Sequence, residues 1–135
     1  MMIEEFKFET SKNDVYALTD RIEQAIAKSG IKEGMCTVHI PHTTAGLCIT
    51  SKWDEADFAD IKSEMRRIVP TRIDFYHQFD TPEDAAGHIK SILTGCTLQI
   101  IVKAGKALLG SSQGVYFLEF DGPRKRMCYV KVYEC

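Results

Sequence analysis

Three histidines have the residue type and local setting of metal ligands: His42, His77 and His88. His42 directly follows Pro41, which ends a strand-like segment, and His77 lies in an aromatic-rich loop sequence. Three imidazoles suit zinc or a similar divalent ion and leave one coordination position open for water or substrate. The separations of 35 and 11 residues match no local zinc signature. Three unrelated polar residues are therefore the alternative interpretation.

Asp84 is the carboxylate best placed to assist one of these histidines. It precedes His88 by four residues on a predicted helix, and side chains at that spacing share one side of the helix. A carboxylate there could hold one imidazole nitrogen and leave the other free for a metal ion. Asp54, near the start of another predicted helix, is a second candidate catalytic acid or base. An acid at that position also fits a favourable interaction with the helix dipole.

A phosphate group has candidate partners in two segments. Arg124 and Arg126 offer permanently charged, bidentate contacts to phosphate oxygens, although a solvated hairpin end explains them equally well. Thr43 and Thr44 could donate hydroxyl or backbone N–H groups to an anion, or could simply close a turn. No serine lies in a nucleophile-elbow pattern, and no cysteine has an identifiable histidine partner, so covalent catalysis is not the preferred chemistry.

The elements that must position these residues follow from the hydrophobic pattern. Alternation predicts strands, here listed in chain order: residues 2–9, 35–41, 47–49, 97–103, 115–120 and 126–133. Three helices are predicted: from a cap at Ser11 or Asn13 to Gly30, over residues 52–68, and from a cap at Thr81 to Gly95. Clustered strands with segregated helices predict an α+β fold with a mostly antiparallel sheet or sandwich.

Apolar periodicity also predicts which helix faces are buried. For residues 52–68 the expected inward residues are Trp53, Ile61, Met65 and Ile68. For the helix after Thr81 they are Ala85, Ile89, Ile92 and Leu93. The strand at 115–120 is apolar on both faces, so a second layer must cover it. That layer comes from the same domain or from a neighbouring subunit.

Composition limits the possible classes of protein. The chain has 135 residues, 44% of them apolar, and a formal net charge of −2, which describes one globular domain over residues 1–135. Such a balance gives no bulk electrostatic reason to bind nucleic acid or an anionic membrane. Five cysteines, an odd number without a C-x-x-C pair, favour reduced thiols in the cytoplasm over disulfides. A zinc site made from these cysteines has no spacing signal.

Five motifs occur in order between residues 42 and 126. They are His42-Thr43-Thr44-Ala45-Gly46-Leu47, Tyr76-His77, Ala85-Ala86-Gly87-His88, Gly105 with Leu109-Gly110-x-x-Gln113, and Asp121-Gly122-Pro123-Arg124-x-Arg126. Together they resemble the YjbQ-like family, and the resemblance covers the whole chain as one domain. It implies a small cytoplasmic α+β or sandwich protein, commonly a homotrimer.

The resemblance also implies a site and an activity. His42, His77 and His88 match a metal-binding trio, while Gln113, Arg124 and Arg126 match motif positions expected at a phosphorylated substrate. The implied activity is a secondary thiamine-phosphate synthase reaction, which joins an aminopyrimidine diphosphate to a thiazole phosphate and releases diphosphate. The other class of function is a non-enzymatic trimeric module that binds a small anionic or phosphorylated ligand.

This sequence departs from the family pattern at three places. Thr50-Ser51 stands where an Asn-Glu pair is common, Ser111-Ser112 replaces a Thr-Trp pair, and Asp84 replaces an asparagine before Ala85-Ala86. The three histidines are unaffected by these changes. The departures fall on the expected pocket wall, so they bear on substrate identity.

Overall fold

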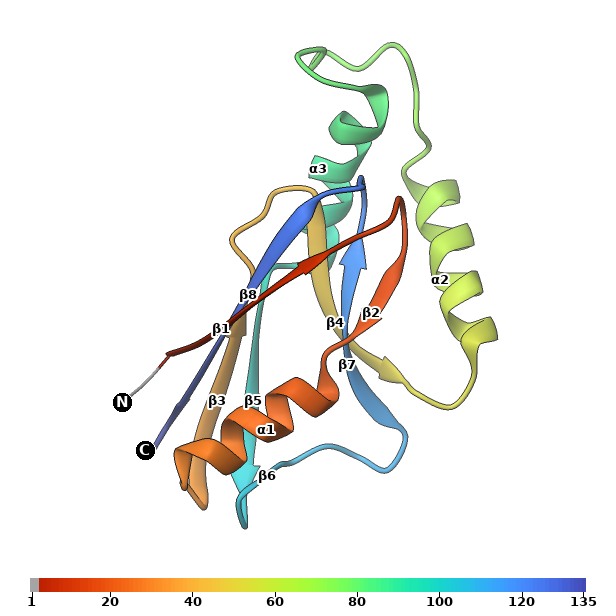
Figure 1. The fold of residues 1–135 in the computed structure, drawn as a ribbon. Helices are drawn as coiled ribbons and strands as arrows, with labels where there is room; N and C mark the ends of the chain where they lie inside the picture. The colour runs from red at the N-terminus through yellow and green to blue at the C-terminus, as the bar shows by residue number, and fades with distance from the viewer. Residues whose placement is uncertain (1–2) are drawn as a thin grey trace.

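The computed structural model describes residues 3–135, apart from the side chains of residues 56 and 57. Two antiparallel sheets and three helices form the described chain, which confirms the α+β prediction (Figure 1). The strands are β1 (Ile3–Glu9), β2 (Val15–Ala17), β3 (Glu33–His39), β4 (Ala45–Ser51), β5 (Thr97–Lys103), β6 (Lys106–Ala107), β7 (Gln113–Glu119) and β8 (Lys125–Tyr133). The helices are α1 (Thr19–Ser29), α2 (Glu55–Ile68) and α3 (Pro82–Thr94). None of the described helices is long and apolar enough to cross a bilayer.

The two sheets enclose the hydrophobic core. One sheet has the strand order β1-β8-β3-β5-β6 and the other has the order β2-β7-β4. Strand alternation places Cys36 and Val38 of β3 inward, where they pack with Val130 of β8 and Phe117 of β7. The amphipathic helix α1 adds Ile22 and further apolar side chains to the same cluster.

The link from β7 to β8 changes sheets, so the two strands do not form a hairpin. β7 pairs with β2 and β4, while β8 pairs with β1 and β3. A hairpin end, one of the two interpretations of Arg124 and Arg126, is therefore wrong. The segment that carries Arg124 instead bridges the two sheets, which brings side chains from both sheets together there.

Both faces of β7 are covered within one chain. Val115 and Phe117 face the core, and the Tyr116 ring lies 4.7 Å from the Phe58 ring of α2, centroid to centroid. The apolar pattern of residues 115–120 therefore gives no evidence for a neighbouring subunit, because α2 already covers the second face.

The helix α3 begins as predicted but buries a different face. Thr81 caps it by accepting a hydrogen bond from the Asp84 N–H at 3.1 Å. Ile89, Ile92 and Leu93 are exposed, contrary to the prediction, and Ile92 is 81% exposed. The buried face is small and polar because the helix packs closely: a Cβ on Gly87 would lie 3.0 Å from the Phe120 carbonyl oxygen.

The other two helices also differ from their predicted form. Residues 15–17 form β2 beside β7, so α1 starts at Thr19, and no side chain caps it. Ser11 and Asn13 are therefore not its caps. Trp53 and Ile68 of the 52–68 segment are exposed, whereas Ile61 and Met65 are half-buried as members of the inner face. Residues 15–17 were expected in the first helix, but their pairing with β7 makes them a strand.

Candidate functional site

The candidate site lies where both sheets meet the first turns of α3. In the β4–β7 register Ala45 pairs with Glu119, so the Thr43–Thr44 turn lies beside the end of β7. The β7–β8 link brings Arg124 to the same place, and the loop before α3 brings His77. Four separate segments of chain thus contribute side chains.

His77, Asp84 and His88 form a compact group of potential metal ligands. Among the described residues, one ligand atom from each of these three lies within 4.8 Å of the others. Oδ2 of Asp84 is 3.3 Å from Nε2 of His77 and 3.1 Å from Nε2 of His88. The two imidazole centroids are 5.0 Å apart. Two imidazoles and one carboxylate, with the carboxylate nearly buried, make a donor set that zinc and similar divalent ions accept.

The hydrogen bonding of His88 indicates that a positive charge fits between these groups. Its Nδ1 lies 3.1 Å from the Thr43 carbonyl oxygen, which can only accept, so Nδ1 carries a proton. In a neutral ring Nε2 is then a bare acceptor, yet it faces the acceptor Oδ2 of Asp84. A proton or a metal ion must lie between them. The Thr43 carbonyl is the partner that commonly orients a ligating histidine.

Arg124 approaches the same carboxylate from its other side. Its Nη2 is 3.5 Å from Oδ1 of Asp84, 3.3 Å from Oδ2 of Asp80 and 2.7 Å from Oδ2 of Asp121. Asp121, mainly through its hydrogen bond, and Asp80 raise the pKa of Arg124. The Arg124 side chain is 40% exposed, so it remains accessible at the edge of the cluster.

His42 lies outside the cluster, so the structure does not bring the three predicted histidine ligands together. The Met127 N–H donates to its Nε2 at 2.9 Å, so that nitrogen is occupied by the backbone of β8. Burial lowers the pKa of His42, and the positive charge of Arg126 lowers it further. Asp84 rather than His42 stands beside His77 and His88.

The lowered pKa of His42 predicts a pH effect on stability. Below about pH 6.5, the ordinary pKa of histidine, the unfolded chain takes up this proton before the folded chain does, so His42 destabilises the fold as the pH falls. His42→Gln should therefore lose less stability than the wild type between pH 7 and pH 5. Thermal melts across this range measure the effect, and parallel melting curves would contradict it.

Arg126 is buried and does not face a ligand. Its side chain is 4% exposed and forms a two-pronged ion pair with the fully buried Glu119. Its Nη2 also donates to the Thr44 hydroxyl at 2.9 Å and to the Thr44 carbonyl at 3.3 Å. The predicted phosphate ligands Arg126 and Thr44 are thus engaged with each other, while Thr43 presents its carbonyl to His88.

Gln113 and Asp54 lie at the opposite end of the three-stranded sheet. Gln113 starts β7, six residues before Glu119, which places it roughly 20 Å away along the strand. Its side-chain oxygen accepts from the Gly110 N–H at 2.8 Å. Asp54 follows the end of β4, whose last residue Ser51 pairs with Gln113. Neither residue joins the histidine cluster of its own chain.

Three acids that the sequence interpretation did not select contribute to the site. Asp80 and Asp121 contact Arg124, and Glu119 pairs with Arg126. A signal for Glu119 exists in the sequence, because it is the single charge in the otherwise apolar segment 115–120. Asp80 carries no comparable signal.

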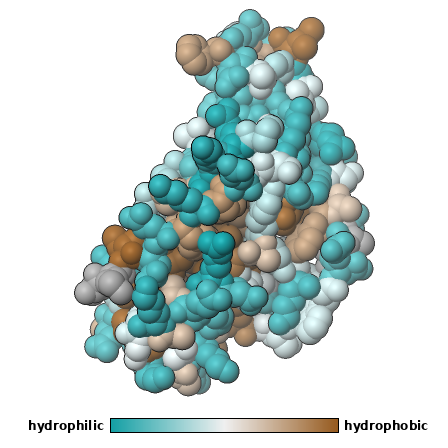
Figure 2. Space-filling view, in the orientation of Figure 1, coloured by the Kyte–Doolittle hydropathy of each residue, from teal (hydrophilic) through white to brown (hydrophobic). Residues whose placement is uncertain are grey.

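Six large apolar side chains are exposed on α3 and in the loop before it, the two segments that carry His88 and His77: Ile73, Tyr76, Phe79, Ile89, Ile92 and Leu93. Figure 2 shows apolar side chains projecting at the top of the molecule, where Figure 1 places this loop. We call these six residues the α3 apolar surface.

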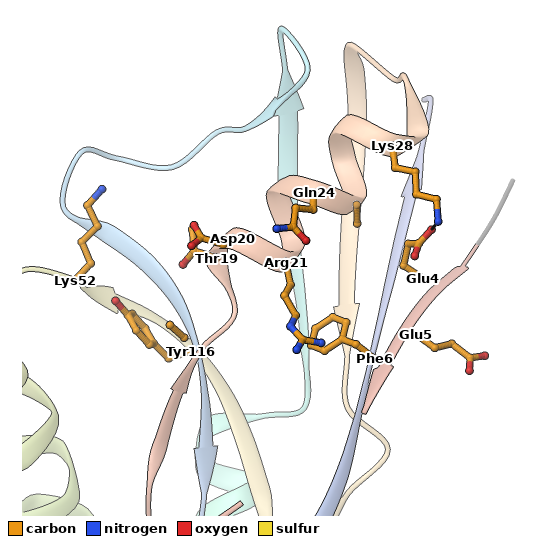
Figure 3. Close-up of a pocket in the computed structure, with 12 residues that line it drawn as sticks. Glu4, Glu5, Phe6, Thr19, Asp20, Arg21, Gln24, Lys28, Lys52 and Tyr116 are labelled. Atoms are coloured by element: carbon orange, nitrogen blue, oxygen red, sulfur yellow. Dashed lines mark ion pairs between the residues drawn. The ribbon is translucent and has the colours of Figure 1, made fainter. Parts of the chain in front are cut away.

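A separate cleft of about 900 Å³ lies beside α1, away from the predicted residues (Figure 3). Two of its cations already have partners: Lys28 pairs with Glu4 at 3.0 Å, and the Arg21 guanidinium stacks 4.8 Å from the Phe6 ring centroid. None of the residues predicted for the site lines this cleft. The histidine cluster is therefore the better candidate for chemistry.

Comparison with known proteins relates this arrangement to one family. The family model "UPF0047 protein YjbQ-like" matches residues 4–135. UPF0047 protein MJ1081 of Methanocaldococcus jannaschii is 40% identical over 97% of this chain and 94% of its own. UPF0047 protein YugU of Bacillus subtilis is 35% identical over 97% of this chain and 98% of its own. A crystal structure of a YjbQ/UPF0047 protein from Clostridium acetobutylicum superposes with a TM-score of 0.89 at 37% identity, covering 96% of this chain and 99% of the other.

Proposed function

Since the chain belongs to the YjbQ-like UPF0047 family, we propose that its histidine cluster is a divalent-metal site of an enzyme that acts on a small phosphorylated substrate. One observation carries this proposal. Asp84 directs one carboxylate oxygen to two imidazoles and the other to Arg124. Metal ligands and a phosphate-binding cation therefore lie on the two sides of a single side chain.

His77, Asp84 and His88 would hold a zinc or similar divalent ion. Such an ion would supply positive charge beside phosphate oxygens or polarise a bound water. Arg124 would bind a phosphate or diphosphate group through the exposed part of its guanidinium. Thr43 would keep His88 oriented through its carbonyl. Arg126 has no role in phosphate binding here, because Glu119 and Thr44 surround it.

The proposed reaction class is the secondary thiamine-phosphate synthase activity. An aminopyrimidine diphosphate is joined to a thiazole phosphate, and diphosphate leaves. Arg124 is suited to neutralise the leaving diphosphate, since its charge is permanent. The alternative is a module that binds a phosphorylated ligand without turnover. The three carboxylates beside Arg124 would compete with an anionic ligand under either function, so they do not separate the two.

Turnover distinguishes the two functions. The purified protein, loaded with Zn²⁺ or Co²⁺, is incubated with both substrates, with and without a chelator. Thiamine phosphate that is formed without chelator but not with chelator supports the enzyme, whereas ligand binding without product supports the module.

His42→Gln tests which residues bind the metal. If this variant keeps the metal affinity of the wild type, the ligand set His77, Asp84 and His88 is supported over the set of three histidines.

We further propose that the α3 apolar surface packs against a second copy of this chain in a homotrimer. Exposed apolar clusters of this kind mark interaction sites, and a neighbour there would shield the metal cluster from water.

Light scattering at micromolar concentration should give about three times the 15.3 kDa chain mass. Ile92→Lys should shift the mass toward that of the monomer. Leu108→Lys, a matched change of an exposed residue outside this surface, should leave the trimer intact. A monomeric wild type would contradict the assembly.

Five free thiols accord with our proposal of a reducing, cytoplasmic location. Burial raises the pKa of Cys36 and Cys48 to about 11 and that of Cys128 to about 12. At pH 8 these three thiols should react slowly with Ellman's reagent, and the exposed Cys135 should react fast. Denatured, unreduced protein should release about five equivalents. A count near one would contradict the reducing location.

A further inference from the structure

We propose that the buried Glu119–Arg126 ion pair is a positioning device that holds two of the three partners of Asp84 in place, namely His88 and Arg124. The inference deepens the proposed function and rests on it, because it assigns a task to residues behind the metal cluster. Neither Glu119 nor Arg126 touches the cluster directly. Each acts through one threonine.

The first connection runs from Arg126 to His88. Nη2 of Arg126 donates to the hydroxyl and the carbonyl of Thr44, and the Phe120 N–H donates to the same carbonyl at 3.0 Å. These contacts fix the Thr44 side chain and the peptide that joins Thr44 to Ala45. The Thr43 carbonyl, which binds Nδ1 of His88, belongs to the preceding peptide, and that peptide ends at the fixed Thr44 residue. Arg126 therefore restrains, through Thr44, the carbonyl that orients a metal-ligating ring.

The second connection runs from Glu119 to Arg124. The Thr10 hydroxyl donates to Oε1 of Glu119 and accepts from the Arg124 N–H at 3.1 Å. The Thr10 N–H also donates to the Arg124 carbonyl at 2.9 Å. The backbone of Arg124 is thus held from both sides by a threonine that Glu119 orients. The guanidinium of Arg124 projects from this fixed backbone toward Asp84.

The cost of burying two charges indicates that the Glu119–Arg126 pair serves to position other residues rather than to stabilise the fold. Side-chain exposures of 4% for Arg126 and 0% for Glu119 mean that both charges have lost their hydration. Desolvation of such a pair commonly exceeds its Coulombic gain, so hydrophobic residues of similar size often stabilise a fold as well or better. The pair also joins β7 of one sheet to β8 of the other.

Two sets of variants test this role. Glu119→Leu with Arg126→Met removes both charges without leaving one unpaired, and Glu64→Leu with Arg67→Met makes the same change in an exposed pair on α2. Thr44→Val removes the hydroxyl that Arg126 contacts, and Thr44→Ser restores it. If the buried double variant fails to fold, the Thr44 pair carries the test alone.

Hydrogen exchange of the metal-free protein gives a readout that a purely stabilising role would not move. The amides of Phe120 and Arg124 in Glu119→Leu/Arg126→Met, and the amide of Phe120 alone in Thr44→Val, should exchange at least about tenfold faster relative to the core amide of Ile100. The α2 control and Thr44→Ser should resemble the wild type. Equal acceleration of all three amides, or none, would overturn the inference.

Co²⁺ binding tests whether the Glu119–Arg126 pair also affects the metal affinity of the histidine cluster. Affinity for Co²⁺, followed by its visible absorption, should fall about 10- to 100-fold in the same two variants, as for other supports of ligating histidines. Unchanged affinity would overturn the inference while leaving the proposed metal site intact. If the wild type binds no Co²⁺ while the variants show the local acceleration of exchange, the metal site is refuted and the positioning of His88 and Arg124 is still supported.

Discussion

Asp84→Ala should reduce the affinity for Zn²⁺ or Co²⁺ about 100-fold or more, which is the largest functional effect we expect from a single substitution. The change removes the only carboxylate between the two imidazoles and one of three acids beside Arg124. Loss of a metal-supporting group already costs 10- to 100-fold, and a direct ligand contributes more. Competition with a chromophoric chelator measures the affinity.

Two further variants make this result specific. Asp84→Asn keeps an oxygen donor without the charge and should lose about tenfold, between Asp84→Ala and the wild type. Asp80→Asn removes an acid that contacts Arg124 but neither histidine, so its metal affinity should stay within about twofold of wild type. Equal losses in Asp84→Ala and Asp80→Asn would assign the effect to net charge and exclude a ligand role.

Gly34→Ala should destabilise the fold by about 3 kcal/mol. A Cβ on Gly34 would lie 2.2 Å from the Tyr133 carbonyl oxygen, which is backbone and cannot rotate aside. The strands β3 and β8 would have to separate where Met35 pairs with Tyr133. Urea denaturation measures the free energy of unfolding, and the melting temperature should fall by about 10 °C.

Gly110→Ala is the matched control for this substitution. A Cβ there meets nothing closer than the Gln113 side chain at 3.5 Å, an ordinary contact. Its stability should change by no more than about 0.5 kcal/mol. If Gly34→Ala unfolds at the same urea concentration as Gly110→Ala, the close approach of β3 and β8 is wrong.

Local signals in the sequence were reliable predictors of the fold. The Thr81 cap, the strand at 97–103 and the shared face of Phe6 and Phe8 are all present. Prediction failed where distant contacts decide. Apolar periodicity places Ile92 inside, but α3 must approach Thr44 and Phe120 so closely that only Gly87 and other small residues fit on that face. Likewise β2 exists only because β7 pairs with it.

The candidate site also combines contacts that local spacing predicts with contacts that it cannot predict. The i, i+4 spacing brings Asp84 to His88, which sequence alone indicates, and His77 lies only seven residues before Asp84. Arg126 looked like a phosphate ligand because its partner Glu119 is in a different sheet, and sheet pairing cannot be deduced from a motif. His42 stays outside the cluster for a similar reason, because its Nε2 accepts a hydrogen bond from the backbone N–H of Met127 in β8.

The pairing of β1 with β8 means that the first strand of the larger sheet cannot be completed until the last strand has been synthesised. β1 is made early, yet every hydrogen-bonded partner it has in its sheet lies in residues 125–131. At bacterial and eukaryotic elongation rates the partner strand appears on the order of 10 s later. Throughout that interval Phe6 and Phe8 have no strand beside them, and the edge of β3 that β8 will occupy is also open. Nascent chains held near one another on a polysome could pair through these edges, because unpaired strand edges are templates for association between chains.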